Sequence, residues 1–337
     1  MNNFKKNQPK QHATPNLSSN NVWLAVGDET GPFEKNTDTD FHGVALVLAR
    51  AEDWLDIASE KIGGETVRDR FTRPVQGLVQ HLAEVYQRDS QRREKEVNKH
   101  HVLAAFDYFN WQKQLPGGSF DLAATSDDPV LLNLLESMRW LARHPKLLSI
   151  GIYGNGGELY QRLYRGDDPM AALGSLYGHL LAVAYPFLGN KPLLRLLLSG
   201  RSEIPGSSGV ARAGVALPGS NRQPSHQTGG DRVNISFVQN SFWESLSALQ
   251  NDIDLPNGAL SRQQTLAAYS FPKQFKDQLD QEGINSPDTD MMKNLADLAC
   301  GMMASLDPKS RGKKIRFNID RQPGPNMRFF NIKDFLS

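Results

Sequence analysis

Residues 22–31, VWLAVGDETG, most constrain the fold of this chain, because an unbroken apolar run there ends in two adjacent carboxylates and a glycine turn. An apolar run without alternating polar residues is typical of a strand covered on both faces. It predicts a central strand, with Gly27 passing close to a neighbouring element. Asp28 and Glu29 then lie where the strand leaves the core, and carboxylates there are costly unless a positive group meets them. A hydrated Mg²⁺ or Mn²⁺ would do so, and solvated turn carboxylates paired with a lysine or arginine fit the same pattern.

Composition excludes several classes of protein. The 337 residues are 39% hydrophobic, which is enough for one large domain or two ordinary ones. Because 38 basic and 37 acidic residues leave a net charge of +1, a nucleic acid would have to be bound by a local basic patch. The single cysteine, Cys300, excludes an intramolecular disulfide and a zinc site built on cysteines.

The first 21 residues are polar and predict a disordered leader rather than a signal peptide. The sequence contains no apolar run of about 18 residues, so no transmembrane helix is expected. We therefore expect a cytoplasmic protein that does not bind a membrane.

The order of the elements predicts an α/β fold. Residues 42–49 form a second apolar run of strand length, expected to pair antiparallel with the first. Asp-Asp-Pro at 127–129 and again at 167–169 predicts the start of a helix, since aspartate caps helices and proline suits their first turn. Each predicted helix is followed by an apolar run, which is typical of a sheet covered by helices.

Residues 204–230 are rich in glycine and proline and contain no acidic residue. They predict a long loop, and such loops are usually functional or disordered. Arg201, Arg212 and Arg222 lie in or beside this loop and are candidates for contacts with nucleic-acid phosphates. A plain flexible insertion explains the composition equally well. Residues 240–285 also read as an insertion.

A late helix is predicted after Ser286 and Pro287, which we interpret as its cap. Its apolar stripe comprises Met292, Leu295, Ala296, Ala299, Met302 and Met303. Asp297 lies almost opposite this stripe, near Gly301 and Ala304, and small residues there favour a close approach to another surface. An ordinary exposed aspartate is the alternative.

The C-terminal tail, residues 309–337, begins with a basic cluster at 309–316. Two segments of alternating apolar residues follow, at 315–319 and 328–335. They predict either a strand that covers the domain's own sheet edge or one that docks on a protein partner.

The two ends of this pattern together resemble a known family. Asp-Glu-Thr-Gly at 28–31 and Asn-Leu-Ala-Asp at 294–297 are similar to the Asp-Glu-Ser-Gly and Leu-Gln-Leu-Ala-Asp motifs of the prokaryotic ribonuclease-H-like group catalogued as domain of unknown function 3800. The resemblance covers about residues 22–306 and implies a domain at 22–308 with a mixed central sheet, flanking helices and helical insertions. It also implies Mg²⁺- or Mn²⁺-dependent hydrolysis of phosphodiester bonds in RNA or DNA, in a genome-defence, antiviral or mobile-element setting.

The resemblance also implies roles for individual residues. Asp28 would be a bridging metal ligand, Asp297 a terminal ligand, and Glu29 an auxiliary ligand or an orienting group. Glu203 is the candidate third ligand, because 199–200 is Ser-Gly where the family usually has an acid. This departure leaves a second hypothesis open, a catalytically inactive scaffold that binds a partner protein or nucleic acid.

Overall fold

The computed structural model describes the parts of the chain that form the sheet and its helices. These are residues 21–30, 41–72, 129–155, 169–189, 192–198, 242–244, 246, 265–269, 272–304 and 326–335. Among the helices in these ranges, none combines the length and the apolar character that crossing a membrane requires.

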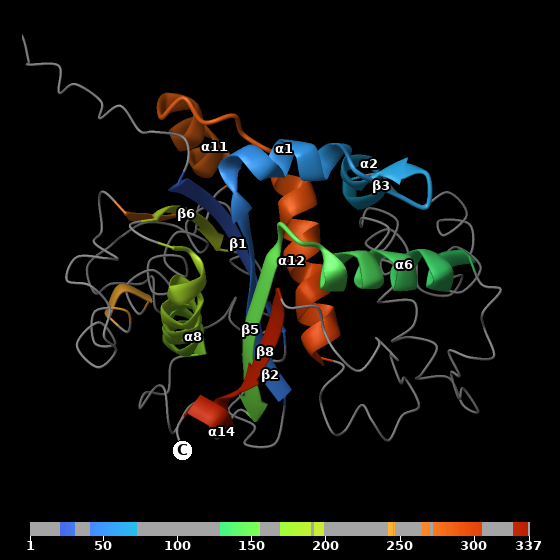
Figure 1. The fold of residues 1–337 in the computed structure, drawn as a ribbon. Helices are drawn as coiled ribbons and strands as arrows, with labels where there is room; N and C mark the ends of the chain where they lie inside the picture. The colour runs from blue at the N-terminus through green and yellow to red at the C-terminus, as the bar shows by residue number, and fades with distance from the viewer. Residues whose placement is uncertain are drawn as a thin grey trace, which may run out of the picture.

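The centre of the fold is a six-stranded mixed sheet in the order β7-β6-β1-β2-β5-β8 (Figure 1). β1 (Val22–Thr30) pairs antiparallel with β2 (Phe41–Arg50) and parallel with β6 (Leu193–Leu198). β2 pairs antiparallel with β5 (Leu148–Asn155). The predicted α/β class, the inner position of the first strand and its antiparallel partner are confirmed.

The two edge strands come from segments that the sequence places outside the core. β7 (Leu266–Tyr269) lies in the predicted insertion 240–285, yet it pairs parallel with β6. The next helix, α11 (Pro272–Gln281), is anchored by Phe275 and Leu279, which are fully buried. β8 (Met327–Asn331) comes from the predicted tail and pairs parallel with β5. This part of the tail therefore extends the domain's own sheet, while 309–325 lies outside the described residues.

Helices cover both faces of the sheet (Figure 1). On the face that we call the α12 face, the core contains residues of α1 (Ala51–Ser59), α2 (Val67–Thr72), α6 (Pro129–Arg143), α11 and α12 (Thr289–Ala304). The opposite face, the α8 face, is covered by α8 (Pro169–Ala184), the short helix η2 (Tyr185–Phe187) and α14 (Ile332–Phe335). A small ribbon, β3 (Lys61–Ile62) and β4 (Glu65–Thr66), joins α1 to α2.

The helix starts agree with the sequence in two cases and differ in one. α6 and α8 begin at Pro129 and Pro169, as the two Asp-Asp-Pro motifs predict. The predicted cap of α12 at Ser286 and Pro287 is wrong. Asp288 caps this helix, because its Oδ1 accepts hydrogen bonds from the backbone N–H groups of Asp290 and Met291 at 3.0 and 3.1 Å.

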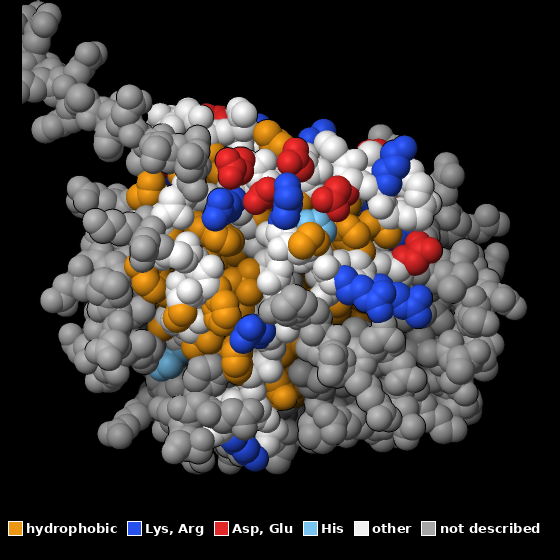
Figure 2. Space-filling view, in the orientation of Figure 1, with side chains coloured by type: hydrophobic (Ala, Val, Ile, Leu, Met, Phe, Trp, Pro, Cys, Tyr) orange, Lys and Arg blue, Asp and Glu red, His pale blue; other side chains and the backbone are white. Residues whose placement is uncertain are grey.

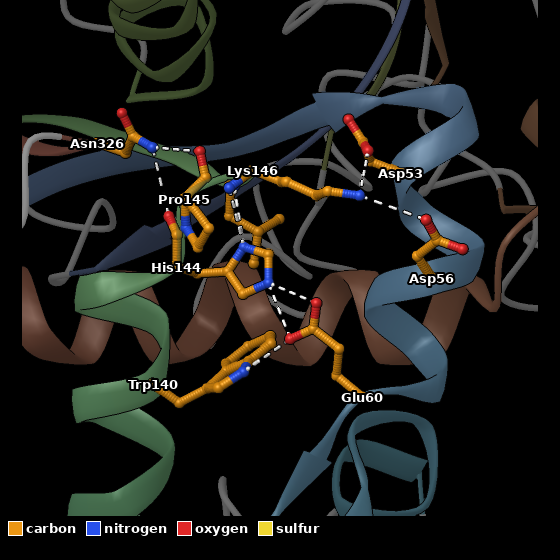
Figure 3. Close-up of polar contacts among 9 residues, drawn as sticks. Asp53, Asp56, Glu60, Trp140, His144, Pro145, Lys146 and Asn326 are labelled. Atoms are coloured by element: carbon orange, nitrogen blue, oxygen red, sulfur yellow. Dashed lines mark hydrogen bonds and ion pairs between the residues drawn. The ribbon is translucent and has the colours of Figure 1, made fainter.

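A polar network fixes the turn between α6 and β5 (Figure 3). His144 Nδ1 accepts hydrogen bonds from the backbone N–H groups of Lys146 and Leu147, both at 3.2 Å, so in the neutral ring the proton is on Nε2. Nε2 then donates to Glu60 at 3.0–3.1 Å, and Trp140 Nε1 donates to the same carboxylate. The network therefore ties α6 and β5 to the end of α1.

Charged side chains extend this network at the surface, where Figure 2 shows acidic and basic groups interspersed over α1. Lys146 Nζ lies 2.8 Å from Asp53 Oδ1 and 3.3 Å from Asp56 Oδ2. Hydrogen bonds to these two carboxylates raise the pKa of Lys146. A charged pair also holds α11, since Arg195 Nε of β6 lies 2.8 Å from Glu282 Oε2.

His144→Leu should lower the free energy of unfolding by about 1–3 kcal/mol, because two backbone N–H groups lose their acceptor and Glu60 loses a donor. Urea unfolding followed by circular dichroism measures this loss. Asp56→Asn, which removes an exposed partner of Lys146, is the control and should leave the unfolding midpoint nearly unchanged. Equal effects of the two substitutions would contradict the account of the network.

The titration of His179 in α8 should decrease the stability of the fold at acidic pH. Burial lowers the pKa of His179, and the hydrogen bond between its Nδ1 and the Ser175 carbonyl oxygen, at 2.8 Å, opposes this shift only in part. Above the unfolded-state pKa of about 6.5 the ring is neutral in both states and adds no pH dependence. Below it, the unfolded chain takes up the proton first, so the native state loses stability until the pH reaches the folded-state pKa.

His179→Asn should reduce this loss, since asparagine does not titrate and its amide can donate to the Ser175 carbonyl. The difference in slope between wild type and variant should be at most about 1.4 kcal/mol per pH unit below pH 6.5. Urea unfolding at a series of pH values measures it. If the free energy of unfolding of the two proteins changed equally with pH below pH 6.5, His179 would not be the source of the loss of stability.

Candidate functional site

Strand alternation places the two neighbouring carboxylates of β1 on opposite faces of the sheet. Leu24 and Val26 belong to the core of the α12 face. Gly27 faces α8, because a Cβ atom there would lie 2.6 Å from Cε1 of Tyr177. Asp28 therefore faces α12, and Glu29 faces α8.

The late helix brings Asp297 to the same place. α12 lies against β1 and β2, and the thiol of Cys300 donates a hydrogen bond to the backbone carbonyl oxygen of Asp28, with Sγ and O 3.0 Å apart. Asp297 precedes Cys300 by three residues, and residues three apart on a helix are neighbours. Asp28 and Asp297, from opposite ends of the sequence, thus both lie beside this thiol.

The electrostatics of Cys300 report the same arrangement. Burial raises the pKa of its thiol well above the usual value, and the negative charges of Asp28, Asp297 and Glu29 raise it further. A hydrogen bond with the Ala45 backbone lowers it in part. Because three carboxylates act on one thiol, negative charge is concentrated where α12 crosses the end of β1, and the thiol stays protonated as a hydrogen-bond donor.

The carboxylates differ in their access to solvent. Asp28 and Asp297 are half-buried, whereas Glu29 is 7% exposed. Two half-buried carboxylates attract a cation more strongly than exposed ones, because the effective dielectric constant is lower there. Asp28 and Asp297 are therefore the pair that could reach both a bound cation and a substrate.

The carboxylates of Asp28 and Asp297 fit a magnesium or manganese ion that also takes oxygen ligands from substrate and water. Mg²⁺ commonly binds one or two carboxylates together with waters and phosphate oxygens. In the part of the chain that the structure describes, no group of three or more His, Cys, Asp or Glu side chains is placed to hold a metal ion. The two aspartates are thus the described carboxylates that could hold such an ion, together with oxygen ligands from substrate and water.

The remaining predicted residues lie outside the described ranges. They are Glu203, the candidate third ligand, and Arg201, Arg212 and Arg222, the candidate phosphate contacts. The loop 204–230 lies outside as well. These assignments stay predictions.

Two residues near the site, Cys300 and His42, have no role predicted from the sequence. The spacing of three residues between Asp297 and Cys300 is a signal that could have indicated one for Cys300. His42 of β2 is fully buried, and alternation puts it on the α8 face with Val44, the cross-strand partner of Glu29. A histidine at the start of an apolar strand carries no sequence signal for this buried position.

In comparisons with known proteins, no family model matches this chain, and no curated protein or solved structure matches it significantly.

Gly27→Ala should destabilise the fold by about 1–3 kcal/mol, since the new methyl group would lie 2.6 Å from Tyr177 Cε1 and 2.9 Å from Leu46 Cδ2. The effect can be measured by urea unfolding. Thr30→Ala, at the half-buried end of the same strand, serves as the control and should lower the free energy of unfolding by less. An unchanged midpoint for Gly27→Ala would show that α8 does not pack on β1 at this residue.

Proposed function

We propose that this protein is a divalent-metal-dependent nuclease that hydrolyses phosphodiester bonds in RNA or DNA, with Asp28 and Asp297 as its ligands for Mg²⁺ or Mn²⁺. The observation that carries the proposal is that both aspartates lie beside Cys300, at the junction of β1 and α12. A site with this much negative charge and partial solvent access is stabilised by a hard cation.

Each carboxylate has a distinct task in this proposal. Asp28 holds the cation from the end of a strand buried in the sheet, and Asp297 holds it from a helix packed on that strand. Both orient the substrate phosphate indirectly, by fixing the position of the cation that the phosphate contacts. Of the two roles expected for Glu29, its place on the α8 face favours an orienting role. When bound, a pair of ions about 4 Å apart would activate water and stabilise the leaving oxygen.

The fold is consistent with this proposal. The resemblance to the ribonuclease-H-like group implies a mixed sheet flanked by helices, with carboxylates from different elements near one another. The mixed sheet, the central strand that carries Asp28 near its end and the late helix that carries Asp297 all support it. A genome-defence or mobile-element setting is part of the same proposal.

The alternative is a ribonuclease-H-like scaffold that binds a partner protein or nucleic acid without cleaving it. One observation favours it. β6 runs parallel to β1, and its residues 193–198, LLRLLL, include no carboxylate. If Glu203 does not supply the missing ligand, a complete pair of metal sites would not form.

Asp28→Asn and Asp297→Asn should each reduce cleavage of RNA or DNA by at least about 100-fold and weaken Mn²⁺ binding, because each removes a charged ligand. Calorimetric titration with Mn²⁺ and gel assays on single-stranded, double-stranded and hybrid substrates measure the two effects. Asp290→Asn, on the exposed first turn of α12, is the matched control and should behave as wild type.

The outcomes separate the two functions. If the Asp28→Asn variant cleaves nucleic acid as fast as the wild type, the nuclease proposal is overturned. If the wild-type protein binds nucleic acid but does not bind Mn²⁺ and does not cleave, the scaffold is favoured.

A further inference from the structure

Helix α12 is held in place by specific contacts with α2 and with the sheet, on either side of Asp297. Three residues before it, Asn294 is buried, and its Nδ2 donates to the backbone carbonyl oxygen of Phe71 at the end of α2. Three residues after it, Cys300 bonds to β1. One turn further, Met303 is buried against the sheet. These contacts lie along the helix at 294, 300 and 303, so they limit both sliding and rotation of the segment that carries Asp297.

Cys300 acts directly on the strand that carries the other carboxylate. Its Sγ donates to the carbonyl oxygen of Asp28, and it also has a hydrogen bond with the Ala45 backbone. Asp28 and Ala45 are cross-strand partners in the β1–β2 ladder. The thiol therefore bridges one residue pair of two strands, and any shift of α12 at this point is a shift relative to Asp28 itself.

Met303 is seated over two glycines of neighbouring strands. A Cβ atom on Gly43 of β2 would lie 2.5 Å from Met303 Cε, and one on Gly151 of β5 would lie 2.6 Å from its Sδ. The thioether thus occupies the space that two absent side chains leave open. Glycine at both positions lets α12 approach the sheet closely at the end of the helix.

We propose that Cys300 and Met303 are positioning residues that hold α12 so that Asp297 lies opposite Asp28, with Cys300 acting through its hydrogen bond and Met303 through its seat over Gly43 and Gly151. This inference rests on the proposed function, because it assigns the two residues to the geometry of the proposed metal site. Residues that orient metal ligands without contacting the metal commonly change metal affinity by about 10- to 100-fold when they are removed.

The test compares the Mn²⁺ affinity of matched variants with their stability. Cys300→Ala removes the donor, and Cys300→Ser retains one on a shorter side chain. Met303→Leu places a branched carbon over the two glycines, whereas Met292→Leu makes the same change at a buried position of α12 outside the seat. Calorimetric titration gives the affinity of each metal-free protein for Mn²⁺, and urea unfolding without metal gives its stability.

Cys300→Ala should bind Mn²⁺ about 10-fold more weakly than wild type, and Cys300→Ser should recover most of this loss. Met303→Leu should weaken binding, while Met292→Leu should bind as wild type even where both lose similar stability. The positioning roles would be overturned if the Mn²⁺ affinity of the variants fell only in step with their free energy of unfolding. They would also be overturned if Cys300→Ser bound Mn²⁺ as weakly as Cys300→Ala.

The failure of the two proposals can be told apart. A wild-type protein that does not bind Mn²⁺ overturns the proposed function, and the positioning proposal with it. A wild-type protein that binds Mn²⁺, with Cys300→Ala and Met303→Leu binding equally well, overturns the positioning proposal alone. If Cys300→Ala does not fold, the Met303→Leu and Met292→Leu pair still decides the role of Met303, and equal Mn²⁺ binding by these two variants overturns the proposal.

Discussion

The packing of α12 across β1 and β2 is the contact on which the candidate site depends. Ten residues of this helix are buried, most of them Met, Leu or Ala. Since burial of a Met or Leu side chain contributes about 1.5–3 kcal/mol, the helix cannot leave the sheet without losing a large part of the domain's stability. The carboxylate of Asp297 is therefore held near Asp28 by apolar packing, which offsets the repulsion between the two acidic groups.

The sheet contributes the other half of this constraint. β1 is covered on both faces, by α12 and by α8, so its end is fixed in position and its side chains alternate between two environments. Asp28 and Glu29 are adjacent in sequence but face different helices. A motif of two neighbouring acids thus places one carboxylate at the half-buried candidate site and buries the other beneath α8.

Much of the fold could be predicted from local patterns. The unbroken apolar run of β1 indicated a strand buried on both faces, and Asp-Asp-Pro marked the starts of α6 and α8. These signals depend on a few neighbouring residues, so the sequence contains them in full. The apolar stripe of α12 was also readable, and all of its six residues are buried.

The remainder depends on contacts between distant residues. β7 is only four residues long and lies in a polar region, so nothing local indicated that it completes the sheet beside β6. The charge of Arg195 interrupts an apolar strand, and its partner Glu282 is far away in sequence. The roles of Cys300 and Met303 arise from where α12 crosses the strands, and residue spacing could suggest the proximity of Cys300 to Asp297 but not to Asp28.

The proposal that Asp28 and Asp297 bind a common cation is tested most directly by anomalous X-ray diffraction from crystals grown with Mn²⁺. The account predicts an anomalous peak within coordination distance of both carboxylates, beside Cys300. A structure with no manganese peak there would contradict it. So would a separation of more than about 10 Å between the two carboxylates, because ions about 4 Å apart could then not be bound by both.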